Sequence, residues 1–270
     1  IKESGAIQWG STATADFYSI YPQRNEAGYE VKTSNDYSAT NATFDLNMPE
    51  TQFCDIAGAN PTMTSADMMA CFMYARTTDV DNGEPTVMLQ YKPLSTAIRF
   101  TLRGPDPDLS SEDEKVSVAR IRLVAPSGTP LTGKFKVNLT GETPVVEAVS
   151  GQTSNVVTVY APYSNGAYLA LANNQSIELN AFIIPVNNLT INENWKLEVD
   201  LANGTTVTKK LKAATTTSNP TPNTNIVAGK IHRLGNTPFL PPGELDPSRW
   251  LEFIPRNVYL SEISIPGSWN

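Results

Sequence analysis

Strict alternation of apolar and polar residues is the feature that most constrains the fold of this chain. Side chains that alternate with a period of two place their apolar members on one face of a β-strand and their polar members on the other. The apolar members of these segments are Ile98, Phe100 and Leu102; Ile121 and Leu123; Phe135, Val137 and Leu139; Ile177, Leu179, Ala181 and Ile183; and Trp195, Leu197, Val199 and Leu201. The pattern predicts half-buried antiparallel strands.

Turns join these segments, and helical periodicity is nearly absent. The dipeptide Asn203-Gly204 between two alternating segments predicts a β-hairpin, because both residues tolerate the backbone of a tight turn. The one modest helix predicted covers residues 64–72, with Thr64 or Ser65 as its N-cap. The fold class predicted from these patterns is all-β.

The length and the distribution of turn residues predict two domains and a tail. A chain of 270 residues exceeds what a single core usually organises. We expect an N-terminal β domain at residues 1–84, built less regularly and with an incomplete sandwich as one alternative, and a strand-dense C-terminal β-sandwich domain at residues 85–236. Residues 237–270 form a Pro-rich tail, either a donor strand or a linker to a further domain.

Charge and hydropathy disfavour several classes of partner. The formal net charge of −7 disfavours nucleic acid and anionic membranes, because phosphate binding needs clustered Lys and Arg. No run of about 18 apolar residues is present, so we expect no membrane-spanning helix. The chain begins at Ile1 instead of Met, and we expect a mature form whose export signal has been removed.

Residues that bind metals or act in acid–base chemistry are scarce. The single histidine, His232, follows a glycine turn and is expected to be a surface residue of a strand. Cys54 and Cys71 lack a Cys-x-x-Cys spacing and form either one disulfide or two buried free thiols. One histidine and two cysteines do not supply a usual zinc site. We therefore expect no metal site and no cofactor.

Acidic clusters and catalytic motifs were considered as further sources of chemistry. Asp79, Asp81 and Glu84 form one acidic cluster and residues 106–114 contain another, which raises calcium binding as an alternative to a solvated loop. No Gly-rich phosphate loop and no Gly-x-Ser-x-Gly motif occurs. No pair among the carboxylates stands out for glycoside hydrolysis. The sequence predicts no catalytic residues, and we expect a protein that is not an enzyme.

Three tyrosines are candidates for contact with a glycan. Tyr160, Tyr163 and Tyr168 flank a loop rich in Pro, Ser, Asn and Gly, which predicts that their rings are exposed. Flat, exposed rings stack on sugars or on apolar partners. We therefore regard these tyrosines as the candidate glycan contacts.

Five segments occur in a characteristic order: DFYSIYP at residues 16–22, DMMACFMYA at 67–75, VMLQYKPLSTAIRF at 87–100, AFIIP at 181–185 and AGKIHRL at 228–234. Their order resembles the fimbrillin family, the subunits of type V pili. In the third segment a Lys-Pro dipeptide stands where the family usually has a histidine. Together the five segments span most of residues 16–234.

This resemblance implies a fold, a location and a mode of assembly. It implies two β-sandwich domains of transthyretin-like topology in a pilus at the outer membrane, which the protein reaches as a lipoprotein. The only expected membrane contact is through a lipid anchor on the precursor. Other pilin subunits are the expected partners, joined by β-strand donation, and host or bacterial surface glycans are expected ligands for adhesion.

The tail supplies the candidate donor strand. Its apolar residues fall on both parities of a strand, so the donor face is not uniform. The donor-strand candidates are Val258, Tyr259, Leu260, Ile263 and Ile265. The alternative is that the tail packs on its own subunit or links it to another domain.

The last residues show a second resemblance. Residues 260–270, LSEISIPGSWN, resemble the opening of phosphatidylinositol-phospholipase-like catalytic domains, with Trp269 in place of the histidine of that motif. The resemblance implies that the tail is a junction to a further domain.

The resemblance to fimbrillins implies that the chain is a structural subunit or a tip or accessory protein of a cell-surface pilus. In this interpretation it assembles by β-strand donation and supports adhesion. The alternative interpretation is a non-polymerising carbohydrate-binding or accessory domain of a longer surface protein.

Overall fold

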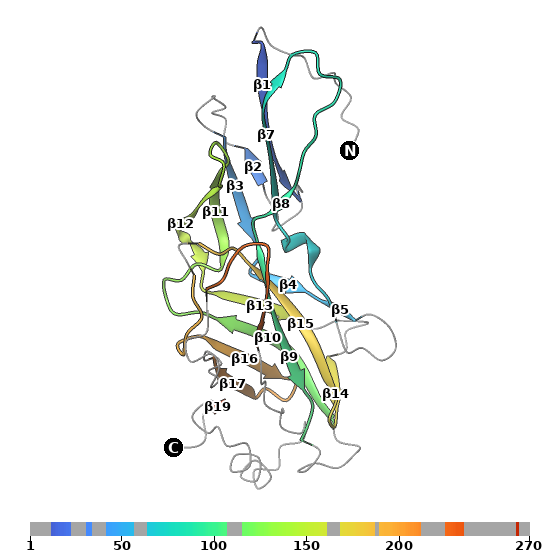
Figure 1. The fold of residues 1–270 in the computed structure, drawn as a ribbon. Coiled ribbons are helices and arrows are strands. Elements are labelled where there is room, and N and C mark those ends of the chain that lie inside the picture. Colours follow the sequence, from blue (N-terminus) through green and yellow to red (C-terminus); the bar gives the residue numbers. More distant parts are fainter. Residues whose placement is uncertain are drawn as a thin grey trace, which may run out of the picture.

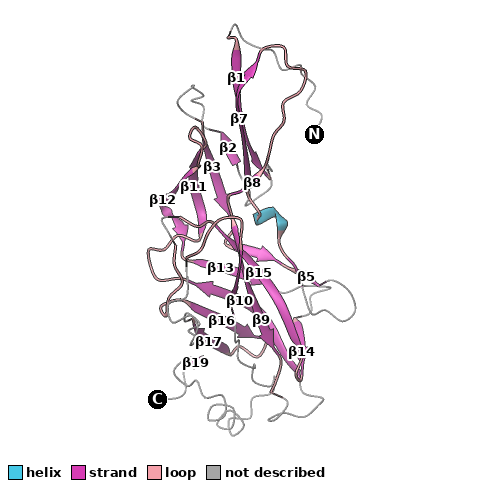
Figure 2. Ribbon diagram, viewed as in Figure 1, coloured by secondary structure: helices cyan, strands magenta, loops and turns pink. Residues whose placement is uncertain are grey.

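The fold is all-β, as the alternation predicted. The computed structural model describes residues 12–22, 31–33, 42–56, 64–106, 115–160, 168–186, 189–211, 225–234 and 263–264. Within these residues the only helical element is one short 3-10 turn, η1 (Met68–Ala70). Figure 2 shows that strands make up almost all of the regular structure.

The largest sheet has seven strands and centres on β10 (Lys115–Val124). Its other strands are β4 (Thr51–Phe53), β13 (Val156–Tyr160), β14 (Leu169–Ala172), β16 (Lys196–Leu201), β17 (Thr206–Lys210) and β19 (Ile263–Ser264). The order is β19-β17-β16-β10-β13-β4, and β14 continues on the β13 side of β10. All of its pairs are antiparallel except β13 with β4.

A three-stranded sheet packs against the seven-stranded sheet across the larger of two cores. Its strands are β9 (Thr96–Arg103), β15 (Ser176–Ile183) and β18 (Ile231–Leu234). Phe100 and Leu179 from this sheet pack in one cluster with Ile121 and Val199 from the seven-stranded sheet. Trp195, which directly precedes β16, is also buried in this cluster.

Two further sheets contribute to the smaller core. One consists of β2 (Val31–Thr33), β3 (Thr43–Met48), β11 (Thr132–Asn138) and β12 (Val145–Ser154). The other consists of β1 (Thr14–Tyr21), β7 (Met73–Asp81) and β8 (Lys92–Pro93). A two-stranded pair, β5 (Asp55–Ile56) with β6 (Thr64–Ser65), completes the described strands. Figure 1 shows β1 and β7 at one end of the molecule and β16, β17 and β19 at the other.

The predicted alternation matches the observed burial. All of the apolar side chains that the pattern singled out are buried, and their polar neighbours in β9, β10, β11 and β16 are more exposed. In β15 the polar neighbour Asn180 is buried as well. The hairpin is also confirmed, because β16 and β17 pair antiparallel around Gly204, whose φ of +88° suits a residue without a Cβ. Period-two patterning therefore locates these strands correctly.

The helix predicted at residues 64–72 is wrong. Thr64 lies in β6 and pairs with β5, so this part of the segment is extended. The side chain of Asp67 accepts a hydrogen bond from the Met69 N–H at 3.1 Å and starts the short turn η1, which ends at Ala70. Tertiary pairing outweighs the modest local preference for a helix.

The two cores take strands from both sides of residue 84. Cys54 belongs to the larger core with strands that follow residue 84, whereas Phe135 and Phe182 belong to the smaller core with Phe44. Strands β9 and β15 contribute to both clusters, since Ala97 and Phe182 face the smaller core. The division into domains at residues 1–84, 85–236 and 237–270 and the transthyretin-like topology stay predictions.

Candidate functional site

The outer face of the seven-stranded sheet, opposite the larger core, carries a group of charged side chains. Ile121 and Leu123 of β10 point into the core, so the alternating Arg120 and Arg122 point outward. A register shift between Val118 and Arg120 changes which residues of β10 face the core. Strand β16 alternates in the same way and presents acidic residues on this face.

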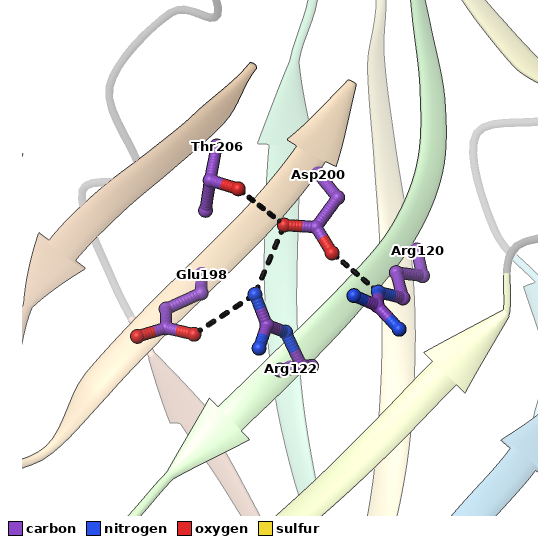
Figure 3. Close-up of polar contacts among 5 residues, drawn as sticks. All are labelled: Arg120, Arg122, Glu198, Asp200 and Thr206. Atoms are coloured by element: carbon purple, nitrogen blue, oxygen red, sulfur yellow. Dashed lines mark hydrogen bonds and ion pairs between the residues drawn. The ribbon is translucent and has the colours of Figure 1, made fainter. Parts of the chain in front are cut away.

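A carboxylate on β16 connects these side chains (Figure 3). Asp200 lies opposite Arg120 in the strand register, and its Oδ2 accepts a hydrogen bond from Arg120 Nε. Its Oδ1 lies 3.0 Å from Arg122 Nη2 and accepts a hydrogen bond from the Thr206 hydroxyl at 2.6 Å. Arg122 Nη2 also lies 3.1 Å from Glu198 Oε2. The five side chains therefore form one connected network.

The network changes the acidities of its members. Burial raises the pKa of Asp200, but the hydrogen bonds from Thr206 and Arg120 and the charges of Arg122 and Arg120 outweigh burial, and the net pKa is lowered. The hydrogen bond to Asp200 raises the pKa of Arg120, and a smaller contribution comes from a side-chain hydrogen bond with Tyr160. Both groups are therefore held in their charged forms, which fixes the guanidinium group of Arg120 in one orientation.

A pair of aromatic rings lies on the same sheet. Phe53 of β4 and Tyr160 of β13 are register partners, and their rings stack with centroids 5.7 Å apart and an interplanar angle of 22°. Tyr160 follows Val159, which pairs with Ile121, so the register places Tyr160 beside Arg120. The Phe53 side chain is 59% exposed.

The aromatic pair and the network thus form one line across five strands, which we call the aromatic–polar row. Its members are Phe53, Tyr160, Arg120, Asp200 and Thr206, on β4, β13, β10, β16 and β17. A second line beside it consists of Thr51, Thr158, Arg122, Glu198 and Thr208. Adjacent members lie about one strand spacing apart, roughly 4.7–4.9 Å. The arrangement places an aromatic stack at one end of the row and fixed charges beside it on the same face of the sheet.

Two of the three predicted glycan tyrosines, Tyr160 and Tyr168, lie among the described residues. Tyr160 belongs to the aromatic–polar row, and Tyr168, which directly precedes β14, is 52% exposed. Tyr163 lies outside the described residues. Leu169 and Leu171 of β14 are buried, so Tyr168 has the outward parity that Tyr160 has on β13.

Phe53 and the charged network were not identified from the sequence. Strand β4 has only three residues, too few to show alternation, although Gln52 and Cys54 on either side of Phe53 are buried. The arginines and carboxylates of β10 and β16 were visible as polar members of alternating segments. Their association depends on the register between the two strands, which alternation does not specify.

One edge of the three-stranded sheet is covered by side chains. The Gln52 amide donates to the Phe182 carbonyl oxygen at 2.7 Å, and Cys54 Sγ donates to the Asn180 carbonyl oxygen at 3.3 Å. The Thr64 hydroxyl donates to the Glu178 carbonyl oxygen at 3.1 Å. Alternate carbonyl groups of β15 thus have partners, a common way to protect an edge strand from further pairing.

The edge of β17 is instead paired with the C-terminal segment. Lys209 and Thr208 are the register partners of Ile263 and Ser264, which form β19 antiparallel to β17. Ile263 is one of the predicted donor-strand residues. The other donor candidates, Val258, Tyr259, Leu260 and Ile265, lie outside the described residues.

The cysteines, the histidine and the acidic clusters are the remaining residues that the sequence raised as candidates for metal binding or catalysis. Cys54 and Cys71 are free thiols, and burial raises the pKa of each. His232 lies in β18 and accepts a hydrogen bond from the Val227 N–H at 3.1 Å. Among the described residues, no three His, Cys, Asp or Glu side chains gather closely enough to hold a metal ion. Most of the acidic cluster at residues 106–114 lies outside that part of the chain.

Comparison with known proteins gave a weak structural similarity and no match to a family. No protein-family model matches it, and no curated protein matches it. Among solved structures, a candidate cell adhesion protein from Bacteroides uniformis is similar over 93% of this chain and 70% of its own length, with 12% sequence identity and a TM-score of 0.41. This similarity is too low to assign a family. In the described part of the chain, no helix has the length and hydropathy needed to cross a membrane.

Proposed function

We propose that this chain is a structural subunit or a tip or accessory protein of a cell-surface pilus, which assembles by β-strand donation and supports adhesion. Its proposed partners are other pilin subunits, together with host or bacterial surface glycans. The proposed location is an outer-membrane-associated pilus, with membrane attachment only through a lipid anchor on the precursor. The proposed role is not enzymatic and involves no nucleic acid.

The observation that carries this proposal is the pairing of β19 with β17. A strand added at a sheet edge gains affinity from backbone hydrogen bonds, which do not depend on whether the strand comes from the same chain. The pairing of Lys209 with Ile263 joins two segments of the same chain. A tail donated by a neighbour would form the same backbone hydrogen bonds at this edge. We propose that donation from a neighbour is the functional arrangement.

The two sheet edges described above differ in a way that supports this choice. The β15 edge already has side-chain partners from Gln52, Cys54 and Thr64, and an incoming strand would have to displace them. In the described part of the chain, the β17 edge is paired with only the two residues of β19. We therefore assign the acceptor edge to β17.

The test uses two copies of the full chain that carry different affinity tags. Purification through one tag should recover the other copy when strands are donated between chains. Ile263→Asp combined with Ile265→Asp should reduce this recovery by at least tenfold, since a carboxylate buried beneath a donated strand costs several kcal/mol. Ile263→Val is the matched control and should retain recovery.

The stability of each variant is measured by thermal unfolding followed by circular dichroism. A variant counts as folded when it keeps the β-sheet spectrum and a cooperative unfolding transition, and only then is its recovery compared with that of the parent chain. Equal recovery by the Asp variant and the parent would refute strand donation. Failure of the parent chain to recover its tagged copy would refute it as well.

The second candidate function is a non-polymerising carbohydrate-binding or accessory domain of a longer surface protein. The stack of the exposed Phe53 ring on Tyr160 favours it, because such rings bind sugars without any polymer. Glycan binding by a chain that never recovers its tagged copy would support this alternative.

A further inference from the structure

We propose that the aromatic–polar row is a binding platform for a neutral glycan, with one sugar ring stacked on Phe53 and a later sugar of the same chain in hydrogen-bonding reach of Arg120, two strands away. The inference rests on the adhesive part of the function proposed above and names its ligand class and its site. It does not depend on strand donation.

The exposure of Phe53 is the first argument. The ring of Phe53 stacks on Tyr160, yet the Phe53 side chain remains 59% exposed. Its exposed apolar surface is in contact with water, which is unfavourable. The stack holds the ring of Phe53 against the ring of Tyr160 at an interplanar angle of 22°. A sugar ring has an apolar face of C–H groups that fits such a surface, so the ligand would cover what Phe53 exposes.

The polar part of the row is the second argument. Arg120 has a side chain that is 45% exposed, and its Nε is committed to Asp200, so its remaining N–H groups are positioned before any ligand arrives. Donors fixed in advance lose little conformational freedom on binding. Sugar hydroxyl groups accept such hydrogen bonds and also donate to carboxylates, as at Asp200 and Glu198.

Charge balance selects the class of glycan. The two arginines, Arg120 and Arg122, are matched by two carboxylates, Asp200 and Glu198, so the platform has no net formal charge. An acidic glycan would find each guanidinium group already paired with a carboxylate and would be repelled by those carboxylates. The platform therefore favours neutral sugars over sialylated, sulfated or uronic-acid glycans.

The geometry suits an extended chain of sugars. The members of the row succeed one another at the spacing of neighbouring strands and lie on one face of the sheet. Phe53 and Tyr160 form the apolar end of the row, and Arg120 with Asp200 forms the polar end. One end of a linear oligosaccharide lying across the strands would contact the rings of Phe53 and Tyr160, and its other end would contact Arg120 and Asp200.

Affinity gel electrophoresis of the full chain tests the proposal. The probes are neutral polysaccharides (mannan, laminarin, xyloglucan and soluble starch) and anionic ones (heparin, alginate and chondroitin sulfate). The parent chain should be retarded by at least one neutral probe. Phe53→Ala and Tyr160→Ala should each weaken retention about tenfold, equivalent to losing one good aromatic contact of ~1.4 kcal/mol.

The matched control is Tyr91→Ala, which removes another half-exposed tyrosine. Tyr91 packs edge-on against Tyr21 with ring centroids 6.3 Å apart, away from the sheet that carries the aromatic–polar row. This variant should bind the neutral probe as the parent does. A loss equal to that of Phe53→Ala would overturn the proposal.

Two further outcomes would overturn it: no retention of the parent chain by any neutral probe, or unchanged retention of the Phe53→Ala chain. Retention by anionic probes alone would contradict the argument from charge. The same gels are run with the Ile263→Asp, Ile265→Asp chain. In the parent chain, glycan retention without recovery of a tagged copy would refute strand donation only, and recovery without glycan retention would refute the platform only.

Discussion

The side-chain amide of Gln52 forms two hydrogen bonds with the backbone of Phe182. Its Nε2 donates to the Phe182 carbonyl oxygen at 2.7 Å, and its Oε1 accepts from the Phe182 N–H at 2.7 Å. Gln52 is fully buried and also donates to the Pro49 carbonyl oxygen at 3.3 Å. One side chain thus replaces a neighbouring strand at the edge of β15, next to both cores.

Gln52→Leu should destabilise the protein by about 2–4 kcal/mol. The substitution preserves much of the volume but leaves the N–H and the carbonyl of Phe182 buried without partners, each at a cost of about 1–3 kcal/mol. Urea unfolding gives the free energy of unfolding. Thr51→Val, on the exposed neighbouring residue, is the control and should change it by less than about 0.5 kcal/mol. A loss below about 1 kcal/mol for Gln52→Leu would contradict this role.

Gly133→Ala should destabilise the protein far more than Gly128→Ala. Both glycines have positive φ, +95° and +83°, so both substitutions carry the backbone cost of about 1–2 kcal/mol. Only at Gly133 would the new Cβ collide with backbone, 2.3 Å from the Gln152 carbonyl oxygen on β12. At Gly128 the space within 4 Å is open.

The collision at Gly133 adds about 1–3 kcal/mol, because β11 and β12 must separate to relieve it. The measurement is the difference between the unfolding free energies of the two alanine variants, which removes the shared backbone cost. Equal unfolding free energies for the two variants would show that β12 moves to accommodate the added methyl group without loss of stability.

Asp200→Asn should make the stability of the protein less sensitive to acid. The pKa of Asp200 is lowered in the folded protein, so its charged form contributes stability above the unfolded value of about 3.9. This contribution disappears as the pH falls through the lowered folded pKa. The parent chain should therefore lose stability below about pH 4 more steeply than the variant.

At neutral pH the same substitution should cost about 1–2 kcal/mol, since it replaces charge-assisted hydrogen bonds from two arginines by neutral ones. Unfolding free energies between about pH 3 and pH 7 provide the comparison. Asp81→Asn, on an exposed position of β7, controls for the loss of one carboxylate. Identical pH profiles for the Asp200 variant and the parent would contradict the network.

The two thiols should react at very different rates. Burial raises the pKa of Cys54 and of Cys71, so both are largely protonated at neutral pH and react slowly. Cys54 is fully buried and Cys71 only partly, so a thiol reagent should modify Cys71 in the native protein and Cys54 only after unfolding. Cys71→Ser is the control and should abolish the native reaction. Fewer than two thiols in the unfolded, unreduced chain would indicate a disulfide.

Sequence patterning was informative wherever a structural choice is local. Alternation alone identified the strands that contain Ile98, Ile121, Phe135, Ile177 and Leu197, and the turn at Gly204 followed from its own residues. The helix predicted at residues 64–72 failed because Thr64 pairs with β5, a tertiary contact that lies outside the segment. Local preference carries little information about such contacts.

The sequence alone determined that this protein is all-β and which face of each longer strand carries the apolar side chains, because period-two alternation places those side chains on one face. Only the tertiary structure decided which strands are neighbours and in which register. That choice brings Phe53 onto Tyr160, Asp200 between Arg120 and Arg122, and Gln52 onto the edge of β15. Each of these contacts joins residues far apart in the chain, and the register that creates them follows from packing of the whole core and not from any one segment.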